Sequence, residues 1–179
     1  MRLLTVVGLV ILALLISGCS TPTQQPTDRA IPVSAPNSDD EIGWVDADGK
    51  FTSLTSTRGK VLVLDFYATY CQPCRKTIPR LMAQQHKYEA KGLQIVGLNV
   101  GGPDDRVKIP LFAKELQITY PLGFPTKALT DLLLKGDLEI PQTFVFKRDG
   151  QQMARYVGLE DSTSDDVDKL IDELMKEQE

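Results

Sequence analysis

The sequence predicts an α/β domain, and three observations support this prediction. Residues 61–67 form an apolar, partly β-branched run that is typical of a strand buried inside a sheet. An amphipathic helical pattern follows, and a second apolar run at 93–100 comes after it. Strand, helix and strand in this order predict a right-handed βαβ unit with two parallel strands.

Local patterns place two elements around the start of this unit. Residues 44–45 and 51–54 are predicted to be short strands, because an Asp-Gly pair between them is typical of a hairpin turn. The helix inside the unit is expected to open at the cysteines of 71–74 and to end near Gly92, since glycine is a frequent helix C-cap.

The C-terminal half predicts further elements. We expect a loop at 101–103, a helix through 111–118 whose start Pro110 limits, and a short helical segment at 129–134. Residues 143–147 and 152–157 flank another Asp-Gly turn and predict a β-hairpin. The final helix is indicated by apolar residues at helical spacing, and acids at 161–168 are expected to be its solvated start. These apolar residues are Val167, Leu170, Ile171 and Leu174.

The first 40 residues are distinct from the domain. Within residues 1–18, the positively charged Arg2 is followed by an apolar run. This run is short for a membrane span and has the length typical of a signal peptide. The end of this run resembles a bacterial lipobox, which implies cleavage before Cys19 and its lipidation. An ordinary signal peptide and a retained anchor helix are the alternatives. Residues 19–40 are polar and predicted to be a flexible tether, which leaves 41–179 as one domain.

Charge and cysteine content narrow the function. The formal net charge of −4 argues against nucleic acid as a partner. If Cys19 is lipidated, only Cys71 and Cys74 of the three cysteines remain as thiols, which excludes a framework of structural disulfides. An exported compartment permits this pair to be oxidised.

The segment Cys71-Gln72-Pro73-Cys74 lies where the predicted central strand meets the helix. Unpaired N–H groups and the positive dipole end of a helix N-terminus stabilise a thiolate on Cys71. Pro73 suits the first turn, where no N–H is needed. Because a thiolate is the species that attacks a disulfide, Cys71 is predicted to attack and Cys74 to resolve the mixed disulfide.

These residues resemble the thioredoxin superfamily, specifically the exported, membrane-tethered TlpA/ResA-like thiol–disulfide oxidoreductases. The matching segments are 59–75, which contains the strand and both cysteines, and 140–145, which contains Pro-Gln-Thr. The similarity extends from about Ile42 to the C-terminus. It implies a thioredoxin-like fold, with a central mixed β-sheet flanked by helices on both faces and an N-terminal β-hairpin extension.

The resemblance also implies roles for individual residues. A cis bond before Pro141 would face the cysteines and leave backbone groups of Ile140 free to pair with an extended substrate peptide. Ile140 and Pro141 would thus form the substrate-binding segment, and Tyr70 and Pro73 are expected to lie beside it. Asp65 stands where thioredoxins carry a buried acid that takes a proton from Cys74, and burial would raise its pKa. The alternative is a solvated Asp65 at a strand end.

Four positions depart from the family pattern. Gln72 is one of them, because Gln72-Pro73 replaces the Gly-Pro of thioredoxins. Tyr67 and Tyr70 stand where tryptophans are usual, so stacking and hydrogen bonding at the site will differ. Thr77 occupies a position where many members of the subgroup place a glutamate near the site. The role of that acid cannot be carried over, which shifts more of the proton handling to Asp65.

Taken as a whole, the resemblance implies a monomeric reductant of the bacterial cell envelope that needs no cofactor beyond the Cys71–Cys74 disulfide. A membrane electron donor of the thioredoxin-reducing type would supply electrons, and protein disulfides such as those of apo-cytochrome c would accept them. The lipid anchor would hold the domain at the membrane, facing the periplasm or extracytoplasmic space.

Three other functions are compatible with parts of this pattern. A thiol oxidase or isomerase of exported proteins, a peroxiredoxin-like peroxidase and a non-enzymatic docking lipoprotein stay as alternatives. The peroxidase would need a Thr-x-x-Cys spacing, and Thr69 lies only two residues before Cys71. No metal site is expected, because His86 is the only histidine and no second cysteine pair exists. Covalent haem attachment would need histidine where Arg75 stands.

Overall fold

The computed structural model describes residues 41–158 and 161–177. The expected signal peptide at 1–18, the lipidated Cys19 and the tether up to residue 40 lie outside these residues. Within the described residues, no helix has both the length and the apolar content needed to cross a bilayer.

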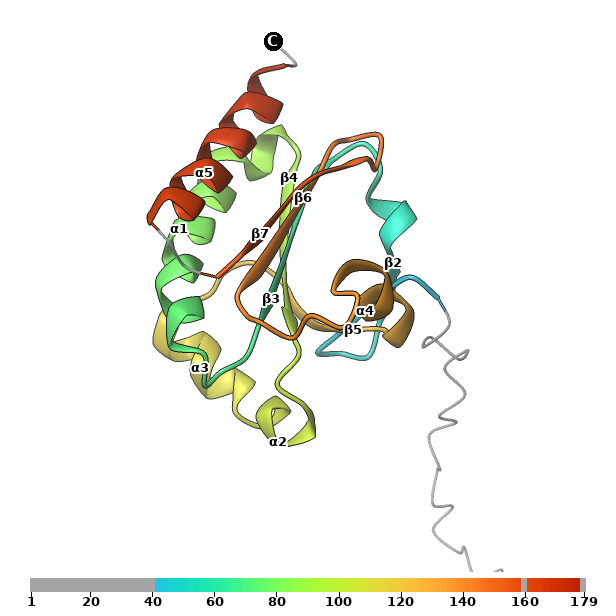
Figure 1. Ribbon diagram of the computed structural model, residues 1–179, viewed down its shortest axis with the longest axis vertical. Helices are drawn as coiled ribbons and strands as arrows, with labels where there is room; N and C mark the ends of the chain where they lie inside the picture. Colours follow the sequence, from blue (N-terminus) through green and yellow to red (C-terminus); the bar gives the residue numbers. More distant parts are fainter. Residues whose placement is uncertain (1–40, 159–160, 178–179) are drawn as a thin grey trace, which may run out of the picture. The chain divides into compact units, whose positions relative to one another are not determined.

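A seven-stranded mixed sheet forms the centre of the domain, in the order β2-β1-β5-β4-β3-β6-β7 (Figure 1). The strands are β1 (Gly43–Asp46), β2 (Phe51–Ser53), β3 (Val61–Tyr67), β4 (Leu93–Asn99), β5 (Leu122–Pro125), β6 (Gln142–Phe146) and β7 (Gln152–Val157). Strands β3, β4 and β5 are parallel to one another, whereas β6, β7, β1 and β2 pair antiparallel with their neighbours. The predicted βαβ unit and both predicted hairpins are therefore confirmed.

Helices cover both faces of this sheet, as predicted (Figure 1). The helices are α1 (Gln72–Tyr88), α2 (Pro103–Arg106), α3 (Ile109–Leu116), α4 (Lys127–Leu133) and α5 (Asp161–Lys176), with 3-10 turns η2 (Leu54–Thr57) and η3 (Glu89–Lys91). Helices α1, α3 and α5 lie on one side, and α4 lies on the other.

The central strand β3 contributes to the apolar cores on both faces of the sheet, because all seven of its residues are buried. Successive side chains of a strand point to opposite faces. Val61, Val63 and Tyr67 accordingly pack with apolar residues of α1 and α5, while Leu62 and Leu64 join the core under α4. Asp65 lies between Val63 and Tyr67 on the face covered by α1.

Two short elements were not expected from the sequence. Strand β5 is held between β4 and β1, although its four residues include glycine and proline. Helix α2 begins at Pro103, inside the segment expected to be a loop, since proline is tolerated in the first turn of a helix. Pro110 is likewise accommodated in the first turn of α3, which therefore starts earlier than the apolar pattern suggested.

Candidate active site

Cys71 and Cys74 form a disulfide where β3 passes into α1. Cys71 is the N-cap of α1, and the backbone N–H of Cys74 donates a hydrogen bond of 3.1 Å to its Sγ. Cys71 keeps 6% of its surface exposed and Cys74 keeps none. An incoming molecule can therefore reach only the first sulfur, which lies where helix N–H groups stabilise negative charge.

The segment around Pro141 meets this disulfide from the other side. The Ile140–Pro141 peptide bond is cis, as the resemblance implied. The carbonyl oxygen of Ile140 lies 3.8 Å from Sγ of Cys71, although the two residues are 69 positions apart. Pro141 is buried and Ile140 is half-buried, so the contact belongs to the fixed part of the domain.

Exposed apolar side chains lie close in sequence to these residues. Tyr70, directly before Cys71, is 64% exposed, and Leu138, two residues before Ile140, is 78% exposed. Pro73 is also exposed. Tyr70 is bonded directly to Cys71, and an exposed apolar group beside a reactive sulfur is suited to contact with another protein.

Asp65 is fully buried within β3, which excludes the alternative of a solvated residue at a strand end. Its Oδ1 accepts a hydrogen bond of 3.1 Å from the hydroxyl of Thr143, its register partner on β6. Among the described residues, Oδ2 has no hydrogen-bond partner. Burial raises the pKa of Asp65 to about 7, against a smaller lowering by the Thr143 hydrogen bond. A carboxyl with this pKa can accept and release a proton near neutral pH.

Leu122 and two tyrosine rings fill the space on the other side of Asp65. Its register partner there is Gly97 of β4, and a Cβ at that position would lie 2.6 Å from Leu122, 3.2 Å from the ring of Tyr120 and 3.3 Å from that of Tyr67. Burial, and then nearby negative charge that includes Asp65, raises the pKa of both phenols, so they stay protonated. Tyr67 is buried and stacks on Phe112, so of the two tyrosines at tryptophan positions only Tyr70 is exposed.

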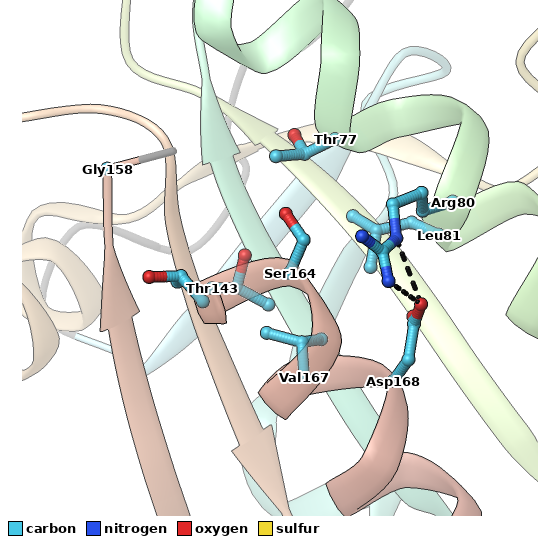
Figure 2. Close-up of a pocket in the computed structure, with 9 residues that line it drawn as sticks. Thr77, Arg80, Leu81, Thr143, Gly158, Ser164, Val167 and Asp168 are labelled. Atoms are coloured by element: carbon cyan, nitrogen blue, oxygen red, sulfur yellow. Dashed lines mark hydrogen bonds and ion pairs between the residues drawn. The ribbon is translucent and has the colours of Figure 1, made fainter. Parts of the chain in front are cut away.

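A small cavity borders Thr143. It has a volume of about 20 Å³, room for roughly one water molecule, and lies between α1, the start of α5 and β6 (Figure 2). Four hydroxyl side chains line it, those of Thr77, Thr143, Thr163 and Ser164. Thr77, at the position of the family's glutamate, donates its hydroxyl to the carbonyl oxygen of Cys74 at 3.0 Å.

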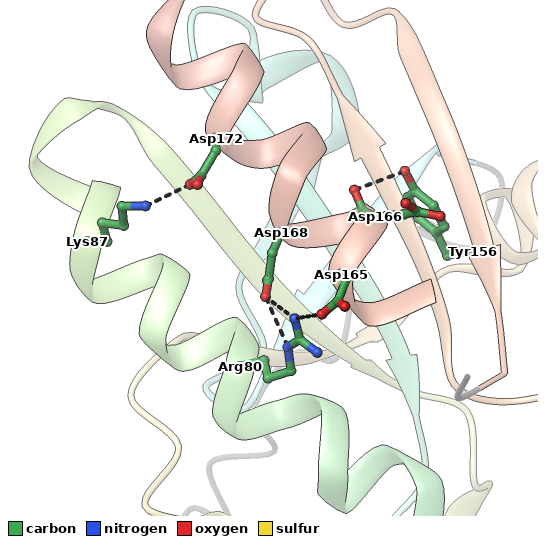
Figure 3. Close-up of polar contacts among 7 residues, drawn as sticks. All are labelled: Arg80, Lys87, Tyr156, Asp165, Asp166, Asp168 and Asp172. Atoms are coloured by element: carbon green, nitrogen blue, oxygen red, sulfur yellow. Dashed lines mark hydrogen bonds and ion pairs between the residues drawn. The ribbon is translucent and has the colours of Figure 1, made fainter. Parts of the chain in front are cut away.

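Ion pairs join α1 to α5 at the edge of this cavity (Figure 3). Arg80 donates from Nη2 to Asp165 at 2.7 Å and to Asp168 at 2.5 Å, and Nε adds a bond of 2.9 Å to Asp168. Two turns further along α1 and one turn further along α5, Lys87 donates a hydrogen bond of 2.8 Å to Asp172. The sequence predicted that the acids at the start of α5 would be solvated. This prediction is wrong for two of them, because Asp165 and Asp168 bind Arg80 of α1.

Several residues of this site were not predicted from the sequence, Thr143 and Asp105 among them. Thr143 was noticed only as part of the Pro-Gln-Thr segment, and its bond to Asp65 follows from strand register. Asp105, described below, has an acidic neighbour in Asp104, and no local signal separates a buried acid from an exposed one. Among the described residues, no group of three or more His, Cys, Asp or Glu side chains is placed to hold a metal ion.

Comparison with known proteins places this chain in a family. Residues 26–152 match the AhpC/TSA family. The thiol-disulfide oxidoreductase ResA of Bacillus thuringiensis is 29% identical over 113 residues, which cover 63% of this chain and 64% of the relative. ResA of Geobacillus thermodenitrificans is 30% identical over 108 residues, 59% of each chain. The chain thus spans less than two thirds of the length of either relative.

Solved structures agree with this placement. The crystal structure of a thiol:disulfide interchange protein of the thioredoxin family from Chlorobium tepidum has a TM-score of 0.61 and 26% identity, covering 75% of this chain and 95% of that one. The predicted thioredoxin-like fold and the predicted resemblance to ResA-type proteins are both confirmed. The chain therefore belongs to the AhpC/TSA family and has a thioredoxin-like fold of the ResA type.

Proposed function

We propose that this protein is an exported thiol–disulfide oxidoreductase that exchanges electrons with protein disulfides through Cys71 and Cys74. The observation that best supports this is the asymmetry of the two sulfurs at the N-terminus of α1. One sulfur is reachable and contacts the backbone of Ile140, and the other is buried. A client peptide that lies along Ile140 would bring its own disulfide next to Cys71.

The reaction proceeds in two exchanges. In the reduced protein, the Cys71 thiolate attacks one sulfur of the client disulfide, forms a mixed disulfide and releases the other client sulfur as a thiolate. Cys74 then gives its proton to Asp65 and attacks Sγ of Cys71, which releases the second client thiolate and closes the Cys71–Cys74 disulfide. The client gains two electrons, and this protein loses them.

We propose that the physiological direction is reduction, on the strength of the similarity to ResA. A membrane donor of the thioredoxin-reducing type returns electrons to the Cys71–Cys74 disulfide. Exported proteins that must be kept reduced, apo-cytochrome c among them, are the clients. The domain of residues 41–179 acts as a monomer outside the cytoplasmic membrane of a bacterial envelope, with Cys19 as the lipid anchor.

Reduction of insulin disulfides in the presence of dithiothreitol tests the activity. We expect Cys71→Ser to abolish turnover, because no nucleophile remains, and Cys74→Ser to accumulate a mixed disulfide that mass spectrometry detects. Turnover with peroxide but none with protein disulfides would contradict the proposal. The reduction potential tests the direction: a value near about −250 mV supports a reductant, and one near about −120 mV supports an oxidase.

A further inference from the structure

The buried carboxylate of Asp105, on α2, accepts hydrogen bonds from the segment that leads into Cys71. Asp105 is 1% exposed. Its Oδ2 accepts hydrogen bonds of 2.8 Å from the backbone N–H of Thr69 and of 2.8 Å from Nδ2 of Asn99. Its Oδ1 accepts the hydroxyl of Thr69. Thr69 is therefore held by both its backbone and its side chain, two residues before Cys71.

The charge of Asp105 is stabilised by these bonds. Burial alone would raise the pKa of the carboxyl, but the hydrogen bonds from Asn99 and Thr69 outweigh burial, and the pKa lies below its ordinary value. A carboxylate is a stronger hydrogen-bond acceptor than a neutral group. A buried carboxylate that loses its donors destabilises the folded protein. The three bonds therefore hold together as a unit.

The surroundings are shaped to let Asp105 approach. A Cβ on Gly101 would lie 2.3 Å from Oδ2 of Asp105, so only glycine leaves room for the carboxylate at that point. Asn99, the last residue of β4, also accepts the backbone N–H of Gly101 at 3.2 Å. The side chain of Asp105, on α2, thus connects the segment after β3 to the end of β4.

This connection continues directly into the helix that carries the disulfide. The backbone N–H of Cys71 donates to the carbonyl oxygen of Ala68 at 3.1 Å, which forms a tight turn around Thr69. Cys71 leaves this turn as the N-cap of α1. If Thr69 moved, Sγ of Cys71 would leave the helix N–H groups that face it.

We propose that Asp105 is a positioning residue for the attacking sulfur: by holding Thr69 it keeps Cys71 at the N-terminus of α1, where the thiolate is stabilised. The inference rests on the proposed dithiol–disulfide exchange. It assigns a role to an acid that touches neither the client nor either sulfur.

Three variants of the full chain separate the hydrogen bonds of Asp105 from its charge. Asp105→Ala removes all three bonds. Asp105→Asn can keep them, since its amide oxygen can take the place of Oδ2 while its amide N–H donates to the Thr69 hydroxyl. Asp104→Asn is the matched control, because it removes an exposed acid from the same helix.

The readout is the rate of Cys71 alkylation in the reduced protein as a function of pH. For Asp105→Ala we expect the midpoint of the profile to rise by about one pH unit, toward the free-thiol value of about 8.5, and the rate at neutral pH to fall about tenfold. Asp105→Asn should react no more slowly than the wild type, since losing a nearby negative charge favours the thiolate. Asp104→Asn should match the wild type.

A smaller change protects the test against misfolding of Asp105→Ala. Thr69→Val removes only the hydroxyl bond and should shift the profile in the same direction, while Thr69→Ser should restore it. A wild-type profile in folded Asp105→Ala or Thr69→Val would overturn the inference, as would an Asp105→Asn protein as slow as Asp105→Ala. Alkylation needs no client, so failure of the wild type to reduce protein disulfides would overturn the proposed function alone.

Discussion

Asp65 is the residue on which the proposed proton transfer depends. It stands among six apolar or aromatic strand residues, and its burial raises the pKa from its ordinary value of 3.8 to about 7. Because the folded protein binds this proton more tightly than the unfolded chain does, the stability that the neutral carboxyl allows is complete below about pH 3.8. That stability is lost as the pH rises through about 7.

Asp65→Asn should therefore separate stability from activity. At pH 8 we expect the variant to be more stable than the wild type by up to about 4 kcal/mol, because about three pKa units of burial cost are removed, and the difference should vanish near pH 4. Urea unfolding of the oxidised proteins at pH 4, 6 and 8 measures this. The same variant should resolve the mixed disulfide more slowly at neutral pH.

Asp104→Asn is the control for this comparison as well, since Asp104 is exposed. A stability gain for Asp65→Asn that did not change between pH 4 and pH 8 would show that Asp65 does not titrate as its burial requires. Unchanged resolution of the mixed disulfide would remove Asp65 from the mechanism.

At the scale of elements, the pairing of α1 with α5 supports the site from behind. Ile78 and Leu81 of α1 and Val167 and Ile171 of α5 share one apolar core with Cys74. The ion pairs of Arg80 lie beside this core, where Arg80 is 39% and Asp168 25% exposed at the side chain. Partial burial and two donors to one carboxylate make this pair stronger than an ordinary surface contact.

A double-mutant cycle with Arg80→Ala and Asp168→Ala should give a coupling of about 1 kcal/mol that weakens as salt is added. Urea unfolding at low and high ionic strength measures it. The pair of Lys127 and Asp131 within α4 is the control, because both side chains are more than half exposed. Its coupling should not exceed about 0.5 kcal/mol. Equal couplings for the two pairs would contradict this assignment.

At the scale of the whole molecule, the proposed lipid anchor on Cys19 and the predicted tether would decide where the chemistry takes place. More than one acyl chain on Cys19 would hold the protein stably on a membrane surface. Residues 19–40 would then give the domain reach, at most roughly 3.5 Å for each residue. The active site could meet both a membrane donor and exported clients.

Cys19→Ser should release the protein from the membrane fraction in a bacterial host, because it removes the proposed site of acylation. Fractionation and mass spectrometry of the N-terminal peptide measure this. Cys71→Ser is the matched control, since it removes a different cysteine and should stay with the membrane. A Cys19→Ser protein that remained bound would favour a retained anchor helix.

The sequence by itself determined the central strands, the helix after the cysteines, both hairpins and the final helix. These elements follow from local patterns, namely apolar residues repeating every two or 3.6 positions and Asp-Gly turns. Each pattern can be recognised within a short segment of the sequence. Burial of Asp65 was implied by the resemblance to thioredoxins, while the sequence left a solvated position at a strand end open; the structure excludes that alternative.

Only the tertiary structure decided the contacts between distant segments. Strand β5 exists because β4 and β1 pair with it, and its short Leu-Gly-Phe-Pro segment carries no strand period of its own. The hydrogen bond from Thr143 to Asp65 and the hydrogen bonds from Thr69 to Asp105 join residues 78 and 36 positions apart. The approach of Ile140 to Cys71 spans 69 positions, and only the family resemblance implied it. Contacts of this kind depend on strand order and register, which local patterns do not record.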